Sequence, residues 1–116
     1  MILDEARVQD MTRNNTKLIA SISQLFLNEL PDMIANIERA YNQNDRSALA
    51  NAVHRLKSAL GNFASKSYYD EFSQLESLAL NASTEGSSLA EWFAAWTAAK
   101  LKLEQMVNEL KSMAGI

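Results

Sequence analysis

Apolar side chains recur along the chain at intervals of three and four residues, and clusters of polar residues interrupt this rhythm at four places. This spacing is typical of amphipathic α-helices, because 3.6 residues per turn bring such positions to one face. The pattern predicts a short helix over residues 4–12 and four longer helices over about 16–42, 46–63, 66–82 and 88–113.

The expected helix starts carry residues that cap helices. Asp4 and Asp45 are suitable N-caps, and Ser88–Glu91 has the spacing of a capping box. Ser83–Ser87 reads as a loop. Pro31 falls inside the second helix, but the apolar stripe keeps its phase across it, so we expect a kink there rather than a break.

Each predicted helix carries one apolar stripe, and these stripes can only be buried against one another. Two tryptophans and a phenylalanine fall within about one turn of the last helix; at this spacing we expect core packing rather than a ligand box. The residues expected to face the core are Ala6, Val8 and Met11; Leu18, Ile19, Ile22, Leu25, Phe26, Leu30, Met33, Ile34, Ile37 and Tyr41; Leu49, Ala52, Val53, Leu56, Leu60 and Phe63; Tyr68, Phe72, Leu75, Leu78 and Ala79; and Leu89, Trp92, Phe93, Trp96, Leu103, Met106, Val107 and Leu110.

Four long amphipathic helices with short connections predict an all-α fold, an up-down-up-down four-helix bundle. The short N-terminal helix is expected to cover one end of it. A length of 116 residues fits a single domain over 1–116 with one core.

The composition narrows the possible functions. The chain has no cysteine, so it has neither disulfides nor thiolate metal ligands, which fits a cytoplasmic setting. The net charge is −3 with both signs interspersed, so nucleic-acid binding is not expected. The sequence has neither the basic start and apolar core of a signal peptide nor an apolar run long enough for a membrane span.

The candidate chemistry centres on His54, the only histidine. At about 100° per residue, it lies roughly 140° from the mean direction of the apolar stripe of its helix. It should therefore point outward near the middle of that helix, with Ala50, Ser58 and Gly61 as small neighbours and Lys57 as an adjacent cation. Such an imidazole is open to another molecule, and the cation could hold an anion beside it. The alternative is an ordinary solvated surface histidine.

Several segments resemble histidine-containing phosphotransfer (HPt) domains, the four-helix bundles that relay phosphoryl groups in two-component signalling. The run His54–Ser58 resembles the family's His-x-Leu-Lys-Gly signature. Phe26 followed by Leu30–Pro31 resembles its Phe…Leu-Pro segment, Asn62–Ser65 its Asn-Leu-Gly-Ala segment, and Leu75–Glu76 a Leu-Glu pair on the next helix. Two glycines of the family pattern are replaced, by Ser58 and by Ala64. The resemblance therefore does not extend to the rate of phosphoryl transfer or to the preferred partner.

The resemblance implies a carrier rather than an enzyme. His54 would be the phosphoacceptor, Lys57 would stabilise the phosphoryl group, and Glu76 would orient the imidazole. Glu76 lies about 80° from the inward direction of its helix, on a flank that could reach His54. Without the resemblance, Lys57 and Glu76 read as solvated surface residues.

The implied partners are response-regulator receiver domains and a hybrid sensor histidine kinase, with docking on Ala50, Ser58 and Gly61. We expect a monomer with no metal site and no cofactor of its own; the family pattern places Mg²⁺ on the receiver. Whether the chain is free-standing or a module of a hybrid kinase stays open.

Two other classes of function remain. One is a helical docking module for a receiver or kinase that carries no phosphate; loss of the histidine would mark it, and His54 is present. The other is an enzyme that uses His54 as a general base, which would require a concave pocket and a second polar group converging on the ring.

Overall fold

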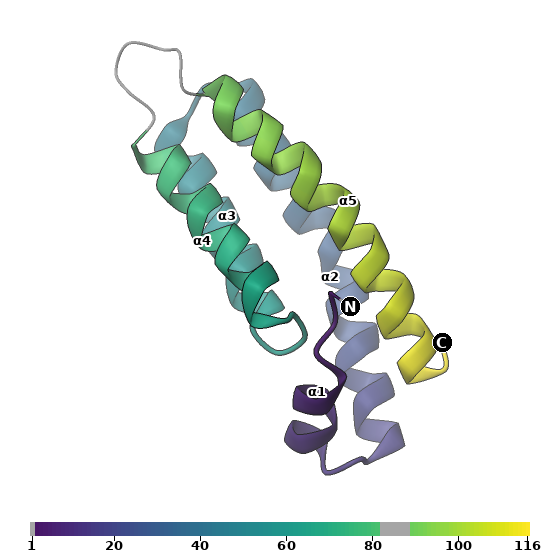
Figure 1. Ribbon diagram of the computed structural model, residues 1–116. Coiled ribbons are helices and arrows are strands. Elements are labelled where there is room, and N and C mark those ends of the chain that lie inside the picture. Colours follow the sequence, from purple (N-terminus) through teal and green to yellow (C-terminus); the bar gives the residue numbers. More distant parts are fainter. Residues whose placement is uncertain (1, 82–88) are drawn as a thin grey trace.

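The computed structural model describes residues 2–81 and 89–116, and within them the chain forms five helices (Figure 1). In chain order these are α1 (Glu5–Thr12), α2 (Thr16–Asn42), α3 (Arg46–Leu60), α4 (Lys66–Leu80) and α5 (Leu89–Ala114). The helices α2 to α5 form an antiparallel bundle in which α3 packs between α2 and α4, and α5 closes the bundle between the same two helices. The predicted all-α bundle with a short N-terminal helix is confirmed.

Side-chain caps set most of the helix starts. The carboxylates of Asp4 and Asp45 accept hydrogen bonds from the backbone N–H groups of Arg7 and Ala48, as expected for N-caps. The helix α2 continues unbroken through Pro31. The predicted loop and capping-box residue over 83–88 lie outside the described residues.

The histidine helix ends three residues earlier than predicted. It stops at Leu60, because the next residues turn back and the backbone N–H groups of Phe63 and Ala64 both donate to the Leu60 carbonyl. Ala64 then forms an isolated antiparallel bridge with Leu3. The extended N-terminal segment therefore takes up the backbone groups that a longer α3 would have used.

Further hydrogen bonds hold α1 and the residues before it at this end of the bundle. The carboxylate of Glu109 on α5 accepts hydrogen bonds from the backbone N–H groups of Ile2 and Leu3. The Arg7 guanidinium donates to the carbonyls of Gly61 and Ala64. The N-terminal segment is thus fixed against the turn that follows α3.

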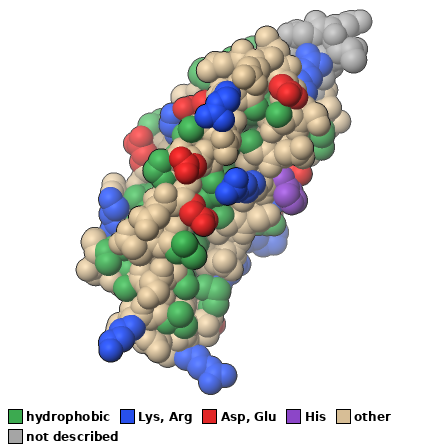
Figure 2. Space-filling model, turned by 180° about the vertical axis from the view of Figure 1, so that it is seen from behind, with side chains coloured by type: hydrophobic (Ala, Val, Ile, Leu, Met, Phe, Trp, Pro, Cys, Tyr) green, Lys and Arg blue, Asp and Glu red, His purple; other side chains and the backbone are tan. Residues whose placement is uncertain are grey.

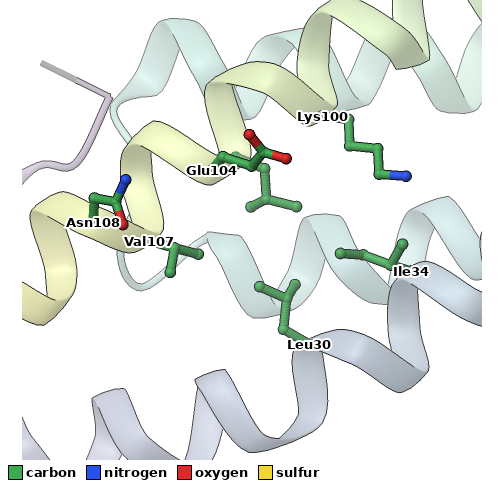
Figure 3. Close-up of a pocket in the computed structure, with 7 residues that line it drawn as sticks. Leu30, Ile34, Lys100, Glu104, Val107 and Asn108 are labelled. Atoms are coloured by element: carbon green, nitrogen blue, oxygen red, sulfur yellow. The ribbon is translucent and has the colours of Figure 1, made fainter. Parts of the chain in front are cut away.

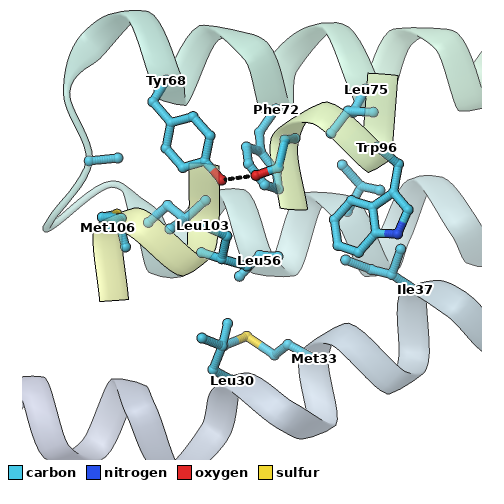
Figure 4. Packing of buried hydrophobic residues seen from close by; sticks show 14 of the residues in the cluster. Leu30, Met33, Ile37, Leu56, Tyr68, Phe72, Leu75, Trp96, Leu103 and Met106 are labelled. Atoms are coloured by element: carbon cyan, nitrogen blue, oxygen red, sulfur yellow. Dashed lines mark hydrogen bonds between the residues drawn. The ribbon is translucent and has the colours of Figure 1, made fainter. Parts of the chain in front are cut away.

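The core is a continuous apolar cluster filled by aromatic and branched side chains from the bundle helices (Figure 4). Trp92 and Trp96 are buried, as predicted, and their rings stack on one another. The hydroxyl of Tyr68 donates a 2.6 Å hydrogen bond to the Ala99 carbonyl, which ties α4 to α5. The helices α2 and α5 are joined by Glu38, whose carboxylate accepts from Lys100.

Some predicted core positions were wrong. Helical periodicity finds the apolar direction of a helix but not the width of the face that its neighbours cover. Residues at the edge of a stripe therefore remain in solvent. The predicted core residues that are exposed instead are Ala6, Met11, Leu18, Leu25 and Phe93.

No helix within the described part of the chain is long and apolar enough to cross a membrane.

Candidate functional site

His54 lies near the middle of α3 on the outside of the bundle, as the helical pattern predicted. Its side chain is 58% exposed, and the histidine stands at the molecular surface in Figure 2. Val53, directly before it, and Leu56, two residues after it, are buried in the core and fix the rotation of α3. The imidazole is therefore accessible to a second macromolecule while its helix is held firmly from behind.

Glu76 on α4 contacts this imidazole directly. Its two carboxylate oxygens lie 3.1 and 3.3 Å from Nδ1 of His54. The two residues are 22 positions apart in the sequence, and the close packing of α3 on α4 brings them together. The position that the pattern placed on a flank of α4 thus faces the histidine.

Lys57 shares the same carboxylate. Its Nζ lies 2.8 Å from Oε1 of Glu76, and only 15% of its side chain is exposed. The alternative reading of Lys57 as a solvated surface residue does not fit this low exposure. The α4 side chains cover Lys57 and hold its ammonium group against α4 rather than in open water.

The charge of Glu76 determines which tautomer a neutral imidazole adopts. Several effects act on the pKa of this carboxyl: the hydrogen bond from Lys57 lowers it most, partial burial raises it, and the hydrogen bond from His54 lowers it again, with a net lowering. Glu76 is therefore an anion near neutral pH and can only accept hydrogen bonds. A neutral His54 must then carry its proton on Nδ1, which leaves the lone pair on Nε2 available as a nucleophile.

Comparison with known proteins agrees with this arrangement. A family model described as Hpt domain matches residues 21–113, which is most of the chain. The chain belongs to the Hpt domain family. Domains of this family serve in histidine phosphotransfer in phosphorelays, and they interact with receiver domains and kinases. No curated protein and no solved structure matches the chain.

The three small residues expected around the histidine of this Hpt domain differ in their surroundings. Ser58 is exposed and Gly61 is half-buried. Ala50 is only 3% exposed, so its expected place on the outer face was wrong. The flank of α3 that carries Ala50 is covered in the packed bundle, and this residue offers a partner almost no surface.

The sequence analysis missed Tyr69, which lies on α4 beside the same site. Its ring centroid is 5.7 Å from Nζ of Lys57. A signal for it was present: Tyr69 precedes Glu76 by seven residues, a spacing that returns to nearly the same side of a helix after two turns.

The Hpt domain also has hollows that His54 does not line. One, of about 350 Å³, lies between α2 and α5 (Figure 3). Its lining is Leu30, Ile34, Lys100, Leu103, Glu104, Val107 and Asn108. His54 does not line it, so this hollow is not the concave pocket around His54 that the enzyme alternative requires. Within residues 2–81 and 89–116, no cluster of three or more His, Asp or Glu side chains could hold a metal ion.

Proposed function

We propose that this Hpt domain accepts a phosphoryl group on Nε2 of His54 and passes it to or from the aspartate of receiver domains. The observation that carries the proposal is the contact between Nδ1 of His54 and the Glu76 carboxylate on an exposed helix face. This contact fixes one tautomer and directs the nucleophilic nitrogen away from the bundle.

Transfer from a receiver would break the bond between phosphorus and the aspartyl oxygen and form a bond between phosphorus and Nε2. The aspartate leaves as a carboxylate, and the electron pair of Nε2 makes the new bond. The proton on Nδ1 remains shared with Glu76, which neutralises the positive charge that develops on the ring. Transfer to a second receiver is the reverse of these steps.

In this role the chain supplies the nucleophile and the docking face, and it is a carrier rather than an enzyme. Lys57 forms an ion pair with the carboxylate that contacts His54, and it would pair with phosphoryl oxygens after transfer. We infer that Mg²⁺ acts on the receiver, as the resemblance implies. We further propose that the chain works as a monomer in the cytoplasm and that its partners are receiver domains and a hybrid sensor kinase.

The test is incubation with phosphorylated receivers, with detection of acid-labile, base-stable label on this chain. The matched control is His54→Gln, which should fold normally because the site is on the surface and should take no label. Binding of a receiver by both proteins without label on either would favour the docking module that carries no phosphate. Label on His54→Gln would show that another residue is the acceptor.

A further inference from the structure

The ammonium group of Lys57 lies close to two groups of α4. Its Nζ lies 2.8 Å from Oε1 of Glu76 and 5.7 Å from the centroid of the Tyr69 ring. A cation within about 6 Å of an aromatic centroid is attracted by the negative face of the ring. The ring and the carboxylate together account for the low exposure of Lys57.

The Tyr69 ring lies beside Gly61 at the end of α3. A Cβ atom at Gly61 would lie 3.6 Å from Cε2 of Tyr69, an ordinary van der Waals distance. Beyond the ring is an open hollow of about 430 Å³. Its lining is Arg7, Gly61, Lys66, Tyr69 and Asp70.

We propose that Tyr69 is a positioning residue for Lys57 in phosphoryl transfer, a role that rests on the proposed function of His54. A phosphoryl group brings about two negative charges to the imidazole. Lys57 must then reorient from Glu76, a competing anion, toward the phosphoryl oxygens. The ring attracts the ammonium group without using its N–H donors, so it keeps the cation at the site while the hydrogen-bond partner changes.

The first test is spectroscopic and uses the unphosphorylated chain. Tyr69→Leu removes the ring but keeps an apolar side chain, and Tyr69→Phe keeps the ring. The ring-current shift of the Lys57 Cε methylene protons should be present in the wild type and in Tyr69→Phe, and absent in Tyr69→Leu. Equal Lys57 shifts in the wild type and Tyr69→Leu would overturn the proposal, and unchanged thermal unfolding checks that the variants fold.

The second test measures the transfer rate from a phosphorylated receiver and the lifetime of the phosphohistidine. Tyr69→Leu should reduce both about two- to fivefold, which corresponds to the lower end of the cation–π range, and Tyr69→Phe should keep both near the wild-type values. In a Lys57→Ala background, Tyr69→Leu should have no further effect. An equal loss in both backgrounds would overturn the proposal, because the ring would then act without Lys57.

Failure of the proposed function has a different signature. A wild-type chain that takes no label from any phosphorylated receiver would contradict phosphoryl transfer itself, and with it the role of Tyr69 in transfer. The methylene shifts would still show whether the ring holds Lys57.

Discussion

The ammonium group of Lys57 forms an ion pair with Glu76, the same carboxylate that accepts a hydrogen bond from the imidazole of His54. One anion on α4 thus contacts both the imidazole and the ammonium group. In the proposed function, Lys57 is paired with the residue that would orient the histidine. Its effect on transfer consequently depends on Glu76 as well as on the phosphoryl group.

We expect Lys57→Ala to slow transfer from a receiver about tenfold and to shorten the phosphohistidine lifetime, without abolishing acceptance. Lys57→Arg should recover part of the rate, because it keeps the charge but not the compact ammonium group. A higher salt concentration should reduce the difference in transfer rate between the wild type and Lys57→Ala only modestly. The Lys57 side chain is 15% exposed, so salt screens its charge weakly. Equal rates for wild type and Lys57→Ala at low salt would show that the lysine has no role.

The shared carboxylate predicts coupling between Lys57 and Glu76. Lys57→Ala leaves Glu76 as an unpaired anion beside the incoming phosphoryl group, so Glu76→Gln should slow transfer less in the Lys57→Ala background than in the wild type. The glutamine still accepts the Nδ1 hydrogen bond through its carbonyl oxygen. A double-mutant cycle of transfer rates measures the coupling. Strictly additive effects would contradict a shared role for Glu76.

The lowered pKa of Glu76 predicts a pH-dependent contribution to stability. A carboxyl whose pKa is lower in the folded than in the unfolded chain stabilises the fold above its ordinary value of 4.5, and this contribution is lost as the pH falls through the folded-state pKa. We expect Glu76→Gln to lower the free energy of unfolding at pH 7, and the difference from the parent to shrink below about pH 4.5.

The free energies of unfolding of the parent and of Glu76→Gln can be measured by urea unfolding in a His54→Gln background. This background removes the His54 contact and leaves the contact of Glu76 with Lys57, which is the largest cause of the lowered pKa. A difference that grows on acidification would contradict the assignment.

Gly61 should tolerate alanine better than tryptophan. A Cβ there would lie 3.3 Å from the Ser58 carbonyl oxygen, a tight contact that small shifts can relieve. A tryptophan would obstruct the approach of a receiver and leave the chemistry of His54 unchanged. Transfer from a receiver should therefore fall much more than reaction with a small phosphoramidate donor. Equal losses in both assays would refute steric obstruction.

Two buried hydroxyls should differ in their effect on stability. The Ser23 hydroxyl is buried and has no hydrogen-bond partner among residues 2–81 and 89–116, so Ser23→Ala should leave the free energy of unfolding unchanged or raise it by up to about 1 kcal/mol. The Tyr68 hydroxyl donates to Ala99, so Tyr68→Phe should lower it by about 1–2 kcal/mol. Urea unfolding of the two variants compares them, and an equal loss in both would mean that Ser23 has a partner in solution.

The number of long helices and the outward direction of His54 followed from the sequence. Apolar spacing and cap residues are local properties of a helix, and four long apolar stripes must be buried together. The end of α3 did not follow, because Leu60 is succeeded by a turn whose backbone is paired with the N-terminal segment. That pairing joins residues about sixty positions apart and has no local signature.

At the site, the sequence by itself determined which residue is the nucleophile candidate and that it faces solvent. Only the tertiary structure decided that Glu76 contacts both His54 and Lys57, that Tyr69 lies over the same ammonium group, and that Ala50 is covered. These contacts depend on the rotation and axial offset of α4 relative to α3. The periodicity of either helix specifies the face that it buries, but not which side chains of two packed helices stand opposite one another.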